Sequence, residues 1–169
     1  LVDRFWEEAA SQVKKLEAAG KVKALFCEGI TAEDKDPLNT IEKLNGHAHG
    51  LIKEKTDEGA LLFPLELYET YAPLIDWRNC LHVVRSAEAY ARIVGFYLEL
   101  QEKRLKRALE VIEGNLKGDD AGLLIMADED RAKIQFPSDI EVFLVTPPSY
   151  DALLKWLRNK MNSMKEGDD

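Results

Sequence analysis

Three short runs of apolar residues constrain the fold more than any other feature of this sequence. They are "VKALFC" at 22–27, "AGLLIMA" at 121–127 and "EVFLV" at 141–145. A continuous apolar run of this length is typical of a strand that is covered on both faces, as in a parallel sheet between helices. Helical patterns alternate with the runs along the chain. The sequence therefore predicts an α/β domain, a three-layer sandwich with a mainly parallel sheet.

Two weaker apolar runs add further predicted strands. One is "ALLFPLEL" at 60–67, where Pro64 favours an edge strand or a bulge because proline has no N–H to donate. The other is "CLHVV" at 80–84. Helical stripes separate the runs, beginning with the one between Asp3 and Ala19. The order of the patterns indicates a single domain covering 1–169.

The longest predicted element is a helix from about 86 to 116. Ser86 is a suitable N-cap, and Gly118 lies just beyond the predicted end. The first half of this helix has two apolar faces and the second half has only one. We therefore expect the first half to be deeply packed and the second half to be more exposed. The main face follows a 4-3 spacing that keeps one seam continuous, formed by Ala87, Ala91, Val94, Leu98, Gln101, Leu105, Ala108 and Ile112. A long core helix and a homodimer along this seam both account for the pattern.

Length, charge and hydropathy exclude several classes of protein. The 169 residues suffice for one domain with a core, and the tail at 165–169 is expected to fray. The net charge of −8 argues against a broad, non-specific grip on a phosphate backbone without a basic patch or a bound cation. No apolar run approaches the ~18 residues of a membrane span. We therefore expect a cytoplasmic protein that has no membrane partner.

The two cysteines, Cys27 and Cys80, are too few for a disulfide framework. Both lie in apolar runs, so the sequence predicts buried free thiols in a reducing compartment. Glu28 adjoins Cys27, and a neighbouring carboxylate raises the pKa of a thiol. We therefore do not expect Cys27 to act as a nucleophile.

Acidic residues follow two of the predicted strands directly. Glu28 ends the run at 22–27, and Asp128 and Asp130 follow the run at 121–127. In an open parallel sheet, functional groups gather at the carboxyl ends of the strands. Mg²⁺ binds oxygen ligands, often one or two carboxylates together with water and substrate phosphate. The sequence therefore predicts a Mg²⁺ site in which Asp128 and Asp130 bind the metal and Glu28 is a ligand or a general base.

These residues resemble the Toprim domain of topoisomerases, primases and some nucleases. In that family one strand ends in Glu-Gly and a later strand ends in Asp-x-Asp. The matching stretches here are "LFCEG" at 25–29 and "IMADED" at 125–130. The resemblance implies Mg²⁺-dependent phosphoryl transfer on nucleic acid. A nucleic-acid partner is therefore expected only if the metal site exists.

The first part of the chain is also similar to the TraB and ChaN-like α/β proteins. In those proteins a helix leads into a strand that ends in Glu, and an Arg-bearing helix precedes a late strand. The similar stretch here is "FWEEAASQVKKLEAAGKVKALFCEG" at 5–29. This resemblance implies a hydrolase.

Three polar features have competing interpretations. The Asp-Glu-Asp sequence at 128–130 is also ordinary for a solvated turn between strands. In "GHAHG" at 46–50, His47 and His49 would point the same way if extended, as in a metal site, but the flanking glycines favour a plain loop. The third feature is the basic cluster, which we interpret as a solvated helix face because glutamates interleave with Lys103, Arg104, Lys106 and Arg107.

Two functions of different class follow from the sequence. The first is a metal-dependent hydrolase or phosphoryl-transfer enzyme that uses Glu28, Asp128 and Asp130. The second is a non-catalytic interaction or scaffold domain that forms a homo-oligomer through its long helix.

Overall fold

Helices and strands alternate along most of the chain. The computed structural model describes residues 1–166, with side chains described through Lys160. The elements are α1 (Val2–Leu16), β1 (Val22–Thr31), α2 (Pro37–Leu44), α3 (Gly46–Asp57), β2 (Leu61–Glu66), α4 (Tyr68–Val83), α5 (Ala87–Asn115), β3 (Ala121–Ile125), α6 (Asp128–Arg131) and α7 (Tyr150–Glu166).

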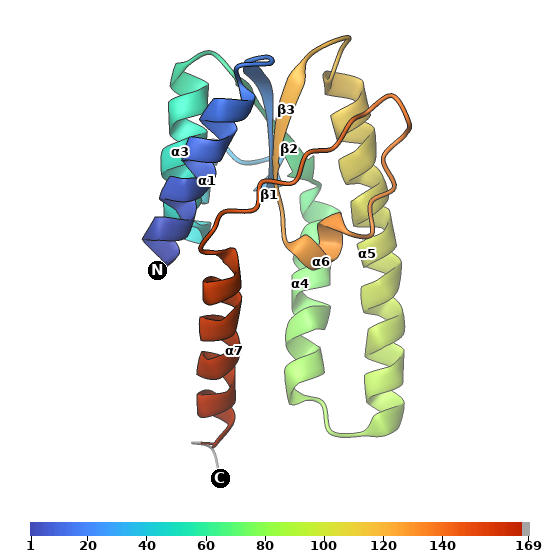
Figure 1. Cartoon of the computed structure of the whole chain (residues 1–169). Helices are drawn as coiled ribbons and strands as arrows, with labels where there is room; N and C mark the ends of the chain where they lie inside the picture. The colour runs from blue at the N-terminus through green and yellow to red at the C-terminus, as the bar shows by residue number, and fades with distance from the viewer. Residues whose placement is uncertain (167–169) are drawn as a thin grey trace.

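The three strands form one parallel sheet in the order β2-β1-β3. Cys27 of β1 lies opposite Pro64 of β2 and Ile125 of β3, so the ladders of all three strands reach the same edge. Parallel neighbours need crossover connections, and helices supply them on both faces. Figure 1 shows α1 and α3 on one side of the sheet and α5 on the other. The predicted three-layer α/β sandwich with a parallel sheet is confirmed.

The core has two parts, because successive side chains of β1 point to opposite faces of the sheet. Phe26 points toward α5 and stacks on Phe63, with ring centroids 5.7 Å apart. The cluster on this face contains Ala24, Phe26, Leu65, Ala108, Val111 and Ile112. The cluster on the other face contains Leu25, Cys27, Ile30, Ile41, Ala48 and Ile52. Burying one large apolar side chain contributes about 1.5–3 kcal/mol.

Two of the predicted strands are wrong. The run at 80–84 continues α4, where it packs as part of a helical hairpin with α5. The run at 141–145 lies outside the sheet, and its Val142, Phe143 and Leu144 side chains are exposed. Short apolar runs do not by themselves distinguish a strand from a buried helix or an unpaired extended segment.

The bounds of α5 agree with the prediction, and Ser86 caps it by accepting a hydrogen bond from the Ala89 N–H at 3.3 Å. The expected order of packing is reversed. All buried residues of α5 lie between Gln101 and Ile112, and 87–100 contains none. The reason is the length of the sheet, since only the second half of α5 lies against the strands. The first half extends beyond them beside α4 (Figure 1).

The end of the chain is only partly described. Residues 165 and 166 are helical in α7, and 167–169 of the predicted frayed tail lie outside the described residues. Over the described part of the chain, no helix has the length and apolar character needed to cross a bilayer.

Candidate functional site

The carboxyl edge of the sheet carries a cluster of charged side chains, of which two are buried and two are partly exposed. Glu28 lies in β1 where its ladder with β3 ends, Glu66 is the last residue of β2, and Asp130 lies in α6 just after β3. Arg104 reaches these three carboxylates from α5. We call these four residues the Arg104 cluster. It occupies the edge at which open parallel sheets bind ligands.

Arg104 and Glu66 form the centre of the cluster. Their side chains are 5% and 2% exposed. The Nε and Nη2 atoms of Arg104 donate to Glu66 Oε1 at 2.9 and 2.8 Å, and Nε also lies 3.0 Å from Oε2. Arg104 Nη1 donates to Asp130 Oδ2 at 2.6 Å, while Glu28 Oε2 lies farther away, 3.6 Å from Nη2. The planar guanidinium thus holds two carboxylates tightly and a third loosely.

The backbone around the cluster is shaped to hold these side chains. Gly29 has a φ of +82°, and its N–H donates to Glu66 Oε1 at 3.3 Å. A Cβ at this position would lie 3.0 Å from Leu44 Cδ1, so both the conformation and the space favour glycine. The Ala127 N–H donates to Glu28 Oε2 at 2.6 Å, which ties the carboxyl end of β1 to the segment after β3.

Two further side chains line the cluster. The ring of Tyr71 lies beside the Arg104 guanidinium, with 5.5 Å between its centroid and Cζ. Burial raises the pKa of this tyrosine, with a further contribution from Glu66. Gln101 of α5 donates a hydrogen bond from Nε2 to Asp130 Oδ1, while its buried Oε1 has no partner among the described residues.

The charges in the cluster depend on one another. Burial alone would lower the pKa of Arg104, but the hydrogen bonds that it donates to Glu66, and then to Asp130, outweigh burial and raise the pKa. Arg104 therefore stays charged throughout the physiological range. Burial, together with the negative charges of Glu28 and Glu66, raises the pKa of Cys27 to about 12. The prediction of buried free thiols is confirmed for Cys27 and is wrong for Cys80, which is only half-buried in α4.

The structure separates the three residues predicted to form a metal site. Glu28 and Asp130 both contact Arg104. Asp128 is 70% exposed and lies outside the cluster, where it pairs with Arg131 at 3.2 Å and accepts a hydrogen bond from Tyr150 Oη at 3.3 Å. Residues 128–130 form most of the one-turn helix α6. The side chains described through Lys160 include no group of three His, Cys, Asp or Glu placed to share a metal ion.

The two histidines lie on a helix rather than a loop. His47 and His49 belong to the first turn of α3, where residues two apart point in different directions. His47 Nδ1 lies 2.9 Å from Asp3. The side chains of His47 and His49 therefore do not point the same way, as they would in an extended His-x-His metal site.

Sequence reasoning missed Arg104 and Glu66 as members of a site. The interpretation of the basic cluster as a solvated helix face is wrong for Arg104, because α5 turns this residue toward the sheet. A signal was present in "LLFPLEL", since a glutamate within a buried strand requires a partner. The sequence does not show which of the basic side chains reaches it.

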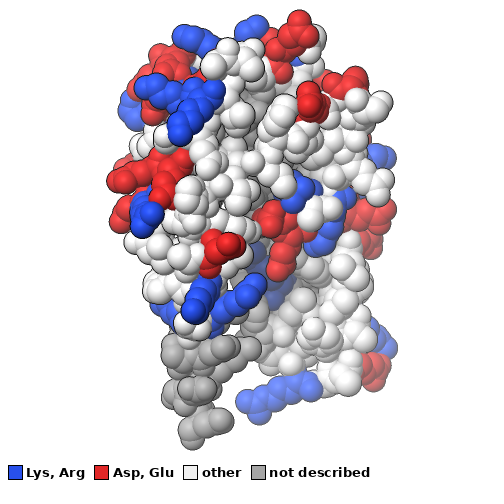
Figure 2. Space-filling view, in the orientation of Figure 1, with Lys and Arg blue, Asp and Glu red and all other residues white. Residues whose placement is uncertain are grey.

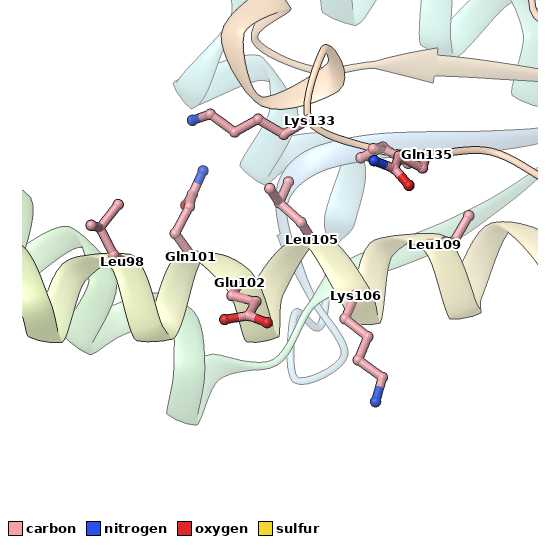
Figure 3. Close-up of a pocket in the computed structure, with 9 residues that line it drawn as sticks. Leu98, Gln101, Glu102, Leu105, Lys106, Leu109, Lys133 and Gln135 are labelled. Carbon is pink, nitrogen blue, oxygen red and sulfur yellow. The ribbon is translucent and has the colours of Figure 1, made fainter.

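A hollow of about 440 Å³ borders the cluster on one side of α5. Figure 3 shows Gln101 and Leu105 projecting from α5 toward the segment that carries Lys133, whereas the end of the Lys106 side chain points the other way. Leu98 and Leu109 extend the apolar wall. Because Gln101 also bonds to Asp130, this hollow is linked directly to the Arg104 cluster.

The surrounding surface is mixed in charge. On the face shown in Figure 2, acidic and basic side chains occur in small neighbouring groups without a broad basic surface. Comparison of the chain with known protein families, with curated proteins and with solved structures finds no match.

Proposed function

We propose that the protein is a metal-dependent hydrolase or phosphoryl-transfer enzyme whose active site is the Arg104 cluster. One observation carries the proposal: three carboxylates lie around the guanidinium of Arg104 at the carboxyl edge of the sheet. They belong to Glu28 of β1, Glu66 of β2 and Asp130, which follows β3 in α6. One carboxylate, that of Glu66, is enough to neutralise the buried Arg104. A cation bound at the site would explain why two further carboxylates lie beside it.

The balance of charge supports a divalent ion. Glu28, Glu66 and Asp130 contribute three negative charges, while Arg104 and Lys133, which lies 3.4 Å from Asp130, contribute two positive charges. One negative charge is left over in a partly buried region. Mg²⁺ can bind through one or two carboxylates with water in its other positions, so Glu28 and Asp130 would suffice.

The residues then have distinct roles. Glu28 is the most exposed carboxylate of the cluster at 33%, and its Oε1 bonds to no other described residue, so it is available as a ligand or general base. Asp130 would be the second ligand. Arg104 positions the carboxylates and adds positive charge where an anionic transition state would form. The hollow beside Gln101 offers apolar walls to the rest of a substrate.

Both family resemblances support this assignment. In the Toprim-like pattern, Glu28 and Asp130 belong to the two motifs, and β1 and β3 are parallel neighbours. Asp128, the first aspartate of the Asp-x-Asp motif, lies outside the cluster. In the TraB and ChaN-like pattern, an Arg-bearing helix precedes a late strand. Here α5 precedes β3, and its Arg104 lies 3.6 Å from Glu28.

Calorimetry with Mg²⁺ and Mn²⁺ tests the proposal. We expect the wild type to bind, and Glu28→Gln and Asp130→Asn to weaken binding by about tenfold or more. Asp128→Asn is the matched control, because it removes one negative charge from a neighbouring exposed position. Hydrolysis of a chromogenic phosphate ester should require the same two residues. Absence of metal binding at millimolar concentrations, or equal loss in all three variants, would refute the metal site.

A second candidate function is self-association through α5. Its first half exposes Tyr90, Phe96 and Leu98, the last at 56%, next to the Trp77–Phe96 ring contact with α4. Light scattering on Leu98→Glu tests this, with Leu61→Glu as the control because Leu61 is equally apolar and exposed at another place. A mass that falls only in Leu98→Glu would support a dimer, and a monomeric wild type would refute it.

A further inference from the structure

A second hollow, of about 310 Å³, lies on the side of α5 opposite the hollow in Figure 3. It is bounded by the end of β2, the first turn of α4 and the middle of α5. Its charged lining residues are Glu66, Lys103, Arg104, Lys106, Arg107 and Glu110. Four cations and two carboxylates thus meet in one hollow of a protein whose net charge is −8.

Two of the four cations have no carboxylate partner among the side chains that the structure describes. Lys103 pairs with Glu99 at 2.7 Å, and Arg104 is held by Glu66. Lys106 and Arg107 form no ion pair with any side chain described through Lys160. The Nε of Arg107 is buried and finds no hydrogen-bond acceptor in that same part of the chain. A buried charged donor without an acceptor is costly, so this atom is expected to have a partner that the chain does not supply.

The amino-terminal end of α4 adds a positive electrostatic potential to the same hollow. Leu67, the N-cap residue, and Thr70 in the first turn both line it. The cap provides no side-chain hydrogen bond to the free N–H groups of this 16-residue helix. The amino-terminal end of a helix carries partial positive charge and attracts anions.

We propose that this hollow binds a phosphate group. Arg107 presents a planar set of N–H donors that matches phosphate oxygens, and Lys106 adds a second full charge. Thr70 adds a hydroxyl that can donate to the same group. The hollow shares Arg104 and Glu66 with the Arg104 cluster, but neither of the proposed metal ligands, Glu28 and Asp130, lines it. The inference therefore goes beyond the proposed function and does not depend on a bound metal.

The test is a titration with inorganic phosphate at constant ionic strength, in the presence of a chelator, so that metal binding cannot contribute. Calorimetry gives the affinity, and amide NMR shifts of Leu67 and Thr70 report the place of binding. We expect Arg107→Gln to weaken binding by at least about tenfold, the loss of hydrogen bonds from a charged donor. Lys106→Gln should weaken it less. Arg92→Gln, the same change in charge on an exposed part of α5, is the matched control.

Each outcome decides the proposal. Shifts at the start of α4 together with a loss confined to Arg107→Gln and Lys106→Gln would support it. No binding at millimolar phosphate, or an equal change in all three variants, would overturn it. Thermal unfolding establishes that each variant folds. If Arg107→Gln does not fold, the proposal is tested by the phosphate affinity of Lys106→Gln, which changes an exposed residue, and by the location of the amide shifts.

Discussion

Two buried cations occupy opposite edges of the sheet. Lys55, near the end of α3, lies at the amino edge, where it contacts Glu17 at 2.7 Å and Glu58 at 2.9 Å. Glu17 also accepts a hydrogen bond from the N–H of Val22, the first residue of β1, at 3.1 Å. Arg104 lies at the carboxyl edge, where Glu66 ends β2. Each cation therefore joins a helix to the end of a strand.

The two networks differ in the burial of their carboxylates. Glu66 is 2% exposed, whereas Glu58 is 44% exposed and is largely solvated even when paired. They also differ in position, because ligands of open parallel sheets bind at the carboxyl edge and not at the amino edge. The Lys55 network is fully explained by the attachment of α1 and α3 to β1. A buried ion pair is therefore not in itself a sign of function, and its place relative to the strands is the more informative property.

Removal of Arg104 should have the largest effect. Arg104→Met leaves Glu66 buried without its partner and should lower the free energy of unfolding by about 3–5 kcal/mol. Urea unfolding followed by circular dichroism measures this. A loss of stability smaller than that of Lys55→Met would show that the greater burial of Glu66 does not make its unpaired charge more costly.

Removal of Lys55 should have a smaller effect. Lys55→Met leaves Glu17 without its cation, but Glu58 simply returns to solvent, so we expect a loss of about 1–3 kcal/mol. Metal and phosphate binding should be unchanged, because both proposed sites lie at the other edge. The same urea titrations and calorimetry provide the measurement. Weaker phosphate binding in Lys55→Met would show that the two edges are coupled.

The stability of the amino edge should depend on pH through Glu17. Burial opposes ionisation of Glu17, but hydrogen bonds from Lys55 and from the Val22 N–H outweigh it and lower the pKa. A lowered pKa in the folded state stabilises the protein above the unfolded pKa, and this contribution is lost as the pH falls through the folded value. The stability gap between wild type and Glu17→Gln should therefore be constant near neutral pH and should close below pH ~4.3. A gap that widens in acid would contradict this.

The layered fold was predictable because burial on both faces leaves a direct mark in the sequence. The runs "VKALFC" and "AGLLIMA" correspond to β1 and β3. Because these strands pair in parallel, Glu28 and the segment after β3 lie at the same carboxyl edge of the sheet. The strand prediction for 80–84 failed because a partly exposed helix end beside another helix can carry the same kind of apolar run, and Val83 is exposed there. Local pattern identifies apolar faces, but it does not specify which neighbour covers them.

The candidate site was predictable only in part, for a related reason. Asp128 and Asp130 are equivalent in sequence, and only the turn of α6 directs one toward Arg104 and the other toward Tyr150. Arg104 lies among Lys103, Lys106 and Arg107, and the helical phase that buries it depends on the sheet beneath. The packing of α5 was predicted in reverse because its apolar faces do not reveal where the sheet ends.

The thiol of Cys27 can report whether the carboxyl edge opens independently of the amino edge. Its pKa of about 12 and its burial should make it unreactive toward thiol reagents in the native state, while the half-buried Cys80 reacts first. Arg104→Met should speed labelling of Cys27, because Glu28 and Glu66, whose charges act on the thiol, lose the cation that holds them. Lys55→Met should leave the labelling rate unchanged while it lowers global stability. Mass spectrometry of labelled peptides separates the two cysteines. Equal acceleration in both variants would mean that Cys27 reports global unfolding, and the two networks would then stabilise one cooperative unit rather than two separate edges.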